Sequence, residues 1–169
     1  DFTDFYGSDS KRLVAYLMGV ALVAGALALV WFFNEVRSRL ADDALSRVGS
    51  TAAVIGAGAA AAGGWILLAP TSVQIMDGDA VFVGAAIART FAQAGLGVML
   101  SLGMTALALA TALFSLGAKR ARLLPSCAAW AGIAVAVVML GSVIWAPGLV
   151  FPVWVLAFGL LIRSEPLAA

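Results

Sequence analysis

The chain has 169 residues, of which 63% are hydrophobic and only 11% are charged, with a formal net charge of +1. Soluble domains carry about 25% charged residues, and a run of about 20 uncharged apolar residues suffices to cross a hydrocarbon core as a helix. Several such runs occur here, rich in Ala and Leu and without the alternation of a membrane β-barrel. The sequence therefore predicts an all-α membrane protein.

The composition also excludes several kinds of chemistry. There is no histidine and a single cysteine, Cys127, which argues against haem, di-iron, zinc and disulfide sites. We find no nucleophile–base pair, phosphate-binding loop, metal-ligand cluster or nucleic-acid signature. We therefore expect a protein that is not an enzyme and that has no cofactor, no metal and no nucleic-acid partner.

The first half begins with a polar lead over 1–12, followed by a predicted span over 13–33. That span ends in Trp31-Phe32-Phe33, an aromatic group typical of a membrane interface. The polar stretch 34–47 is predicted to extend this helix into water.

Two acid–base pairs support that extension. Glu35 precedes Arg39, and Asp43 precedes Arg47, each by four residues. This spacing and order favour ion pairs along one helix face.

The second and third spans carry small residues at four-residue spacing. Such faces let two helix backbones approach closely, within one chain or between copies. They are Gly56, Ala60 and Gly64 in span two (48–69), and Gly95, Met99 and Gly103 in span three.

Between these spans, Pro70 is predicted to end a helix, and 71–79 to form a loop. The following apolar run, 80–116, would measure about 55 Å as one helix, far more than a membrane requires. We therefore expect it to divide into a small interfacial helix over 79–91, with Asp79 as its N-cap, and span three over 92–116.

The last third begins with a basic loop, 117–126, followed by a fourth span over 127–145. Ala146-Pro147-Gly148 then breaks the helix. The apolar run 150–162 is short, so it forms either a thin fifth span or the returning arm of a re-entrant hairpin. Four long helices, a short fifth and a tail over 164–169 thus make one bundle, 13–163.

The distribution of Lys and Arg predicts the orientation, because cytoplasmic loops carry the excess of positive charge. The expected inner side holds Arg37, Arg39, Arg47, Lys119, Arg120, Arg122 and Arg163, and the outer side Lys11, Arg12 and Arg89. We therefore expect a multi-pass protein of the plasma membrane with its N-terminus outside and its C-terminus in the cytoplasm.

Arg89 stands out because apolar sequence flanks it on both sides. Gln93 follows one turn later, and Asp77 or Asp79 could fold back to pair with it. Asp-Gly-Asp lacks the rest of a calcium loop and predicts a turn. Two interpretations follow. The four residues form a binding site for an anion or a lipid headgroup on the outer side, or Arg89 simply reaches the headgroup level and is neutralised there by a nearby Asp or a lipid phosphate.

The hydroxyl groups of span three and Cys127 each have a functional interpretation and a simpler structural one. The hydroxyls of span three could line a polar track, or could bond to the preceding turn; they belong to Ser101, Thr105, Thr111 and Ser115. Cys127 is either a palmitoylation site or a small packing residue.

An ordered set of segments spans nearly the whole chain: FYGSDSKRLVAYL, VWFFNEVRSRL, AIARTFA, RARLLPSCAAWAG and LVFPVWVLAFGLLI. Together they resemble a family of small polytopic membrane proteins of unknown function from actinobacterial genomes. In that family a basic residue and then Trp usually follow the loop proline, whereas here Ser126 and Cys127 follow Pro125 and the tryptophan is Trp130. The resemblance implies the fold and topology, and no catalytic residue.

These observations favour a small membrane subunit or scaffold that associates through its Gly/Ala faces with itself or with a larger complex. Its other expected partners are membrane lipids. The alternative is a small-solute, ion or lipid transporter or channel with an outer site at Arg89.

Overall fold

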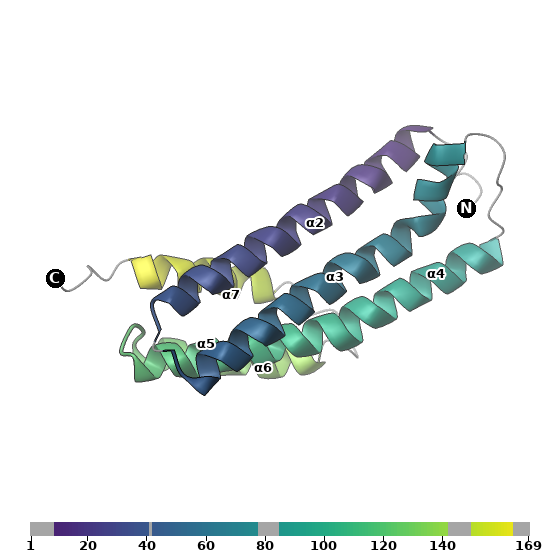
Figure 1. Ribbon diagram of the computed structural model, residues 1–169. Coiled ribbons are helices and arrows are strands. Elements are labelled where there is room, and N and C mark those ends of the chain that lie inside the picture. The colour runs from purple at the N-terminus through teal and green to yellow at the C-terminus, as the bar shows by residue number, and fades with distance from the viewer. Residues whose placement is uncertain (1–8, 41, 78–84, 142–149, 164–169) are drawn as a thin grey trace.

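The computed structural model describes residues 9–40, 42–77, 85–141 and 150–163, and every regular element in these ranges is helical (Figure 1). The helices are α2 (Asp9–Ser38), α3 (Ala44–Asp77), α4 (Ala85–Gly97), the π-helix η2 (Val98–Gly103), α5 (Met104–Arg120), α6 (Ser126–Gly141) and α7 (Val150–Arg163). Three segments are long and apolar enough to cross a membrane: Leu13–Ser38, Ala44–Pro70 and Ala86–Arg120. The prediction of an all-α membrane bundle is confirmed at this level.

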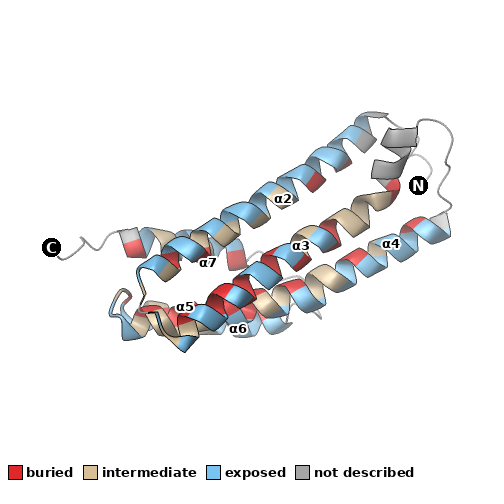
Figure 2. Ribbon diagram, viewed as in Figure 1, coloured by how far each residue is buried: buried red, intermediate tan, exposed pale blue. Residues whose placement is uncertain are grey.

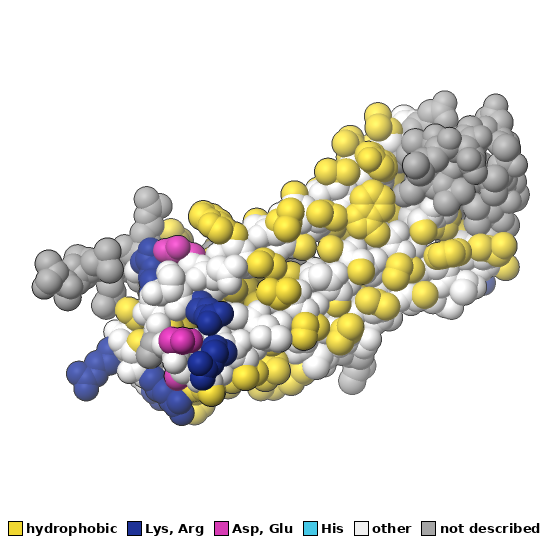
Figure 3. Space-filling view, viewed as in Figure 1, with side chains coloured by type: hydrophobic (Ala, Val, Ile, Leu, Met, Phe, Trp, Pro, Cys, Tyr) yellow, Lys and Arg dark blue, Asp and Glu magenta, His cyan; other side chains and the backbone are white. Residues whose placement is uncertain are grey.

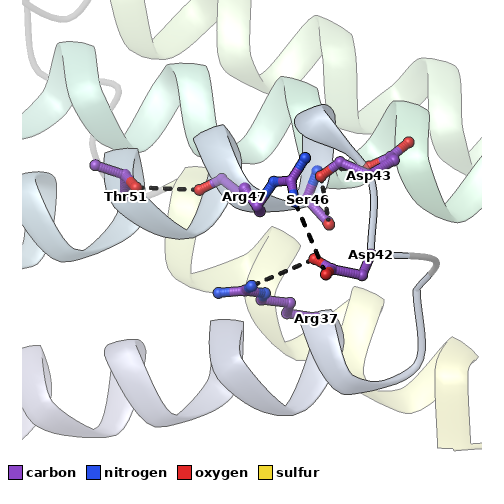
Figure 4. A network of polar contacts seen from close by, with 6 residues as sticks. All are labelled: Arg37, Asp42, Asp43, Ser46, Arg47 and Thr51. Carbon is purple, nitrogen blue, oxygen red and sulfur yellow. Dashed lines mark hydrogen bonds and ion pairs between the residues drawn. The ribbon is translucent and has the colours of Figure 1, made fainter.

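The helices α2 and α3 form an antiparallel hairpin whose turn is fixed by short polar contacts (Figure 4). The backbone N–H of Ser46 donates to Asp43 Oδ1 at 2.9 Å, so Asp43 caps the first turn of α3. The expected Glu35–Arg39 pair is present at 2.9 Å. Arg47 instead lies 3.9 Å from Asp42. The predicted Asp43–Arg47 pair is therefore replaced, because the cap occupies the Asp43 carboxylate.

The predicted end of a helix at Pro70 is wrong, and so is the loop over 71–77. The helix α3 continues through Pro70 to Asp77, and its last turns bend toward the start of α2 (Figure 1). Proline removes only the hydrogen bond to the carbonyl of Ile66 and crowds it, which kinks a helix without always ending it. Asp79, the predicted N-cap, lies outside the described residues.

The predicted division of the third apolar run is also wrong where the structure describes it. Residues 85–120 form one helical rod: α4 continues through the expected boundary between 91 and 92, and a π-helix follows it at Val98–Gly103. Gly95, Met99, Gly103 and Leu107 recur every four residues, a longer spacing than the 3.6 residues of an α-turn. The wider turn of η2 keeps all four on the side that contacts α3. This unbroken contact explains why the rod stays in one piece.

The hairpin α6–α7 covers only one end of the molecule. Its described helices have 16 and 14 residues, which at 1.5 Å per residue is about 24 and 21 Å, less than a bilayer core of about 30 Å. Figure 1 places both beside the α2–α3 turn, whereas the helices that the structure describes at the opposite end are α2, α3 and α4. The expected fourth span, 127–145, is described only to Gly141.

The apolar core lies where this hairpin meets the long helices. The rings of Phe33 and Phe114 stack at 5.0 Å between α2 and α5. Trp154 contacts Phe158 at 4.6 Å within α7, and Phe158 reaches Phe32 of α2. The Phe32–Phe158 pair joins α7 to α2, while α6 packs along α5.

The turn between α5 and α6 is a Schellman motif. Leu123 N–H donates to the Ala118 carbonyl at 2.9 Å, and Arg122 N–H to that of Lys119 at 3.2 Å. Arg122 has φ 57°, the left-handed conformation that usually falls to glycine. A side chain there costs about 1–2 kcal/mol.

We expect Arg122→Gly to raise the free energy of unfolding by about 1 kcal/mol, because glycine adopts this conformation without strain. Unfolding in mixed micelles, followed by circular dichroism, measures the change. Arg122→Ala is the control, since it removes the charge but keeps the strain. An equal gain in both variants would contradict the prediction by assigning the effect to charge.

Candidate functional site

The Gly/Ala faces predicted from spacing meet each other inside one chain. A Cβ built on Gly56 would lie 2.8 Å from Leu107 N and 3.0 Å from the Gly103 carbonyl. One on Gly103 would lie 3.2 Å from Ala60 N. The two faces therefore form the seam between α3 and the α4–α5 rod, and four of the five predicted packing residues lie in it.

Gly64, the fifth predicted packing residue, faces the other side of α3. A Cβ there would come 2.5 Å from Leu22 Cδ1 of α2. The seam uses Gly63 instead, whose added Cβ would lie 2.6 Å from the Gly95 carbonyl. Adjacent residues project about 100° apart around an α-helix, so the glycine doublet lets α3 contact α4 through Gly63 and α2 through Gly64 at one level.

Arg89 and Gln93 are both exposed and lie one turn apart on α4. The antiparallel contact of Gly95 with Leu67 carries Arg89 beyond the level of Pro70, toward the end of the bundle. Near a helix end an arginine reaches the headgroups at little cost. This placement favours the simpler of the two interpretations of Arg89.

The predicted acidic partners of Arg89 are not placed by the structure. Asp79 and the side chain of Asp77 lie outside the described residues. Their pairing with Arg89 stays a prediction.

The span-three hydroxyls do not share one face. Ser101 and Thr105 are exposed, and Ser101 Oγ bonds to the Gly97 carbonyl. Thr111 and Ser115 are fully buried. The described part of the rod therefore has no continuous polar track, and Ser101 and Thr111 instead follow the alternative, a bond to the preceding turn.

The two buried hydroxyls differ in their partners. Thr111 Oγ1 donates to the Leu107 carbonyl at 2.7 Å. Ser115 Oγ has no hydrogen-bond partner among the described residues. It occupies the space that a Cβ on Gly132 would take. Trp154 Nε1 also lies near this space, 2.8 Å from the position of that Cβ. Glycine in α6 thus makes room for a hydroxyl and an indole.

Charged side chains gather at the end of the bundle that holds the α2–α3 turn (Figure 3). Asp42 contacts Arg37 at 3.5 Å and also Arg47 (Figure 4). Lys119 lies 4.7 Å above the ring of Trp130. Cys127 is exposed near this end, at the start of α6, so the packing role considered for it is not found.

A hollow of about 360 Å³ lies at this end, between the last turns of α2 and α7. Its walls are apolar, except for the ion pair Glu35–Arg39 at one side. The lining residues are Trp31, Phe32, Glu35, Val36 and Arg39 of α2, with Gly159 and Ile162 of α7. We call it the α2–α7 groove.

Sequence reasoning missed this groove, because it depends on where a short helix docks. The available signal was an interfacial aromatic run followed within two turns by Glu35 and Arg39. That pattern places apolar and charged side chains close together on one helix end, whatever packs beside it.

A scan of the chain against protein-family models matches none, and the comparisons with curated proteins and with solved structures find no match. The resemblance to an actinobacterial membrane family therefore stays a prediction.

Proposed function

We propose that this membrane protein is a non-enzymatic subunit or scaffold whose long helices associate with another copy or with a larger complex. The observation that carries the proposal is the exposed apolar surface of α2, which extends toward the end of the described bundle opposite the hairpin. There α2 and α4 each pack on α3, and Figure 2 shows α2 exposed along most of its length. Only 11% of its most apolar window is buried, against 39% for α3.

The associating surface differs from the one that the spacing of small residues suggested. The Gly/Ala faces are occupied by contacts within the chain. The outer side of α2 is available to a partner, and its exposed residues include Leu17, Met18 and Leu27. Association in a bilayer then depends on shape rather than on burial from water, because lipid tails are as apolar as these side chains.

The distribution of charge supports an inner position for the hairpin end. The α2–α3 turn, the α5–α6 turn and the end of α7 hold seven of the ten basic residues. Under the positive-inside rule this end faces the cytoplasm, the N-terminus lies outside and the membrane is the plasma membrane. This orientation holds whether α6 and α7 both cross the membrane or only re-enter it.

A transporter or channel with an outer site at Arg89 takes second place. It would require a polar path from Arg89 into the bundle. Arg89 and Gln93 are exposed on α4. They line neither the α2–α7 groove nor the smaller hollow beside the α2–α3 turn, whose walls are Asn34, Arg37, Ser38, Leu40 and Asp42.

The mass of the intact particle tests the subunit proposal. We expect native mass spectrometry after mild-detergent purification to give a defined oligomer or a complex with another protein. Leu17→Trp on the exposed side of α2 should disrupt that assembly, whereas Leu161→Trp on the hairpin, also exposed, should not. A monomer carrying only lipid, at all concentrations and also in nanodiscs, would overturn the proposal.

A further inference from the structure

We propose that the α2–α7 groove binds one phospholipid of the phosphatidylethanolamine class, with an acyl chain in the groove and the headgroup on Glu35 and Arg39. This inference rests on the membrane location of the protein and not on its role as a subunit. It concerns a different surface from the outer side of α2 described above.

The groove has the right composition for an acyl chain. Apart from the one ion pair its walls are Trp31, Phe32, Val36 and Ile162, and Gly159 leaves space between the two helices. A Cβ at Gly159 would meet Phe32 at 3.5 Å, so a larger side chain would fill the opening.

The groove also lies at the right depth. Trp31 is 73% exposed at the end of the apolar part of α2, where an indole prefers the boundary between tails and headgroups. Glu35 and Arg39 follow one and two turns later, toward the water. A lipid aligned with the bundle would therefore place its tail beside Trp31 and its headgroup beside the ion pair.

The ion pair matches a headgroup that carries both charges. Arg39 donates Nε–H and one Nη2–H to Glu35 Oε1, at 3.2 and 2.9 Å. A guanidinium has five N–H groups, so three remain for a phosphate. The Glu35 carboxylate can accept from a primary ammonium, which has three N–H donors, but a choline headgroup has none.

An anionic lipid fits the groove less well. Glu35 balances Arg39 locally, and Arg37 and Arg47 are both engaged by Asp42. The basic residues of the α5–α6 turn belong to a different pair of helices. A headgroup without a cation would place its negative charge beside the Glu35 carboxylate, and Arg39 is the one basic side chain among the described residues that line the groove.

Quenching of Trp31 by brominated lipids tests the proposal. The full chain is placed in phosphatidylcholine bilayers that contain a small, fixed fraction of acyl-brominated phosphatidylethanolamine, phosphatidylcholine or phosphatidylglycerol. The difference between the protein and its Trp31→Phe variant isolates the Trp31 signal. We expect phosphatidylethanolamine to bind about three- to fivefold more tightly than either other lipid, which is the upper part of the range for an exposed ion pair.

Three variants separate the parts of the site. Glu35→Gln keeps an oxygen for Arg39 but removes the charge. Phosphatidylethanolamine and phosphatidylcholine should then bind about equally. Asp42→Asn, a matched loss of an acid outside the groove, should keep the preference. Gly159→Leu should abolish it by filling the groove. If Gly159→Leu does not fold, Glu35→Gln and Asp42→Asn still decide the question.

Two results would overturn the proposal. One is equal quenching by all three lipids, which means contact with bulk lipid only. The other is a preference for phosphatidylglycerol that survives Glu35→Gln, which means that the net positive charge of this end, rather than the ion pair, selects the lipid.

Discussion

Gly95→Ala is expected to lower the free energy of unfolding by about 3 kcal/mol, the upper end of the range for overpacking. Its Cβ would lie 2.5 Å from the backbone nitrogen of Leu67 and 2.9 Å from its Cα, and would overlap the Gly63 carbonyl. All three neighbours are backbone atoms, so no side-chain rotation relieves the clash. The α4–α5 rod and α3 must separate, which also weakens the contact at Gly103.

Gly97→Ala provides the control, two residues away on the same helix. Nothing lies within 4 Å of a Cβ at Gly97, and alanine is the better helix former by about 1 kcal/mol. Its stability should therefore stay equal or rise. Reversible unfolding in mixed micelles, followed by tryptophan fluorescence, measures both variants. A loss of less than 1 kcal/mol for Gly95→Ala would show that the two helices are not in close contact there.

The seam shows what sequence spacing can and cannot establish. Four-residue spacing found Gly56, Ala60, Gly95 and Gly103, because close backbone contact leaves no alternative to small residues. It selected Gly64 over Gly63, because a four-residue pattern on one helix does not fix which neighbour each side faces. The structure shows which helix each glycine contacts: Gly63 lies against α4, and Gly64 lies against α2.

The errors along the chain have a shared cause. Pro70 and the length of the third apolar run were both interpreted by local rules: proline ends a helix, and a span matches the membrane thickness. In the structure, contact along α3 holds the rod together through a π-turn, and the loss of one hydrogen bond at Pro70 bends α3 without ending it. In the rod, tertiary contact along α3 outweighs the local preference for a break.

The two ends of the bundle therefore differ in how they are stabilised. The hairpin end has a core of aromatic rings and a capped turn. At the opposite end the described helices are α2, α3 and α4, of which α3 lies against the other two. The groove follows from the first arrangement, because α7 docks on α2 mainly through aromatic contacts around Phe32 and Phe158. Charge pattern alone could place the basic residues at one end, but not this docking.

The contact between Ser115 and Gly132 gives the second large expected effect. Gly132→Ala would drive a methyl group into Ser115 Oγ and to 2.8 Å from Trp154 Nε1. Both neighbours are side chains that can shift, so we expect a loss of about 2 kcal/mol in the free energy of unfolding. Gly141→Ala on the same helix, with nothing within 4 Å of its Cβ, is the matched control.

Ser115→Ala should act in the opposite direction. The hydroxyl is fully buried and has no partner among the described residues, and an unsatisfied buried group costs about 1–3 kcal/mol. Its removal should stabilise the protein by about 1 kcal/mol, while the matched variant Thr111→Ala, which loses a satisfied hydrogen bond, should not. The free energy of unfolding of the double variant Ser115→Ala/Gly132→Ala should be higher than the value obtained by adding the effects of the two single changes. The expected coupling is about 1–2 kcal/mol. A destabilising Ser115→Ala would instead mean that this hydroxyl has a bound water or ligand as its partner, in the space between α5, α6 and α7.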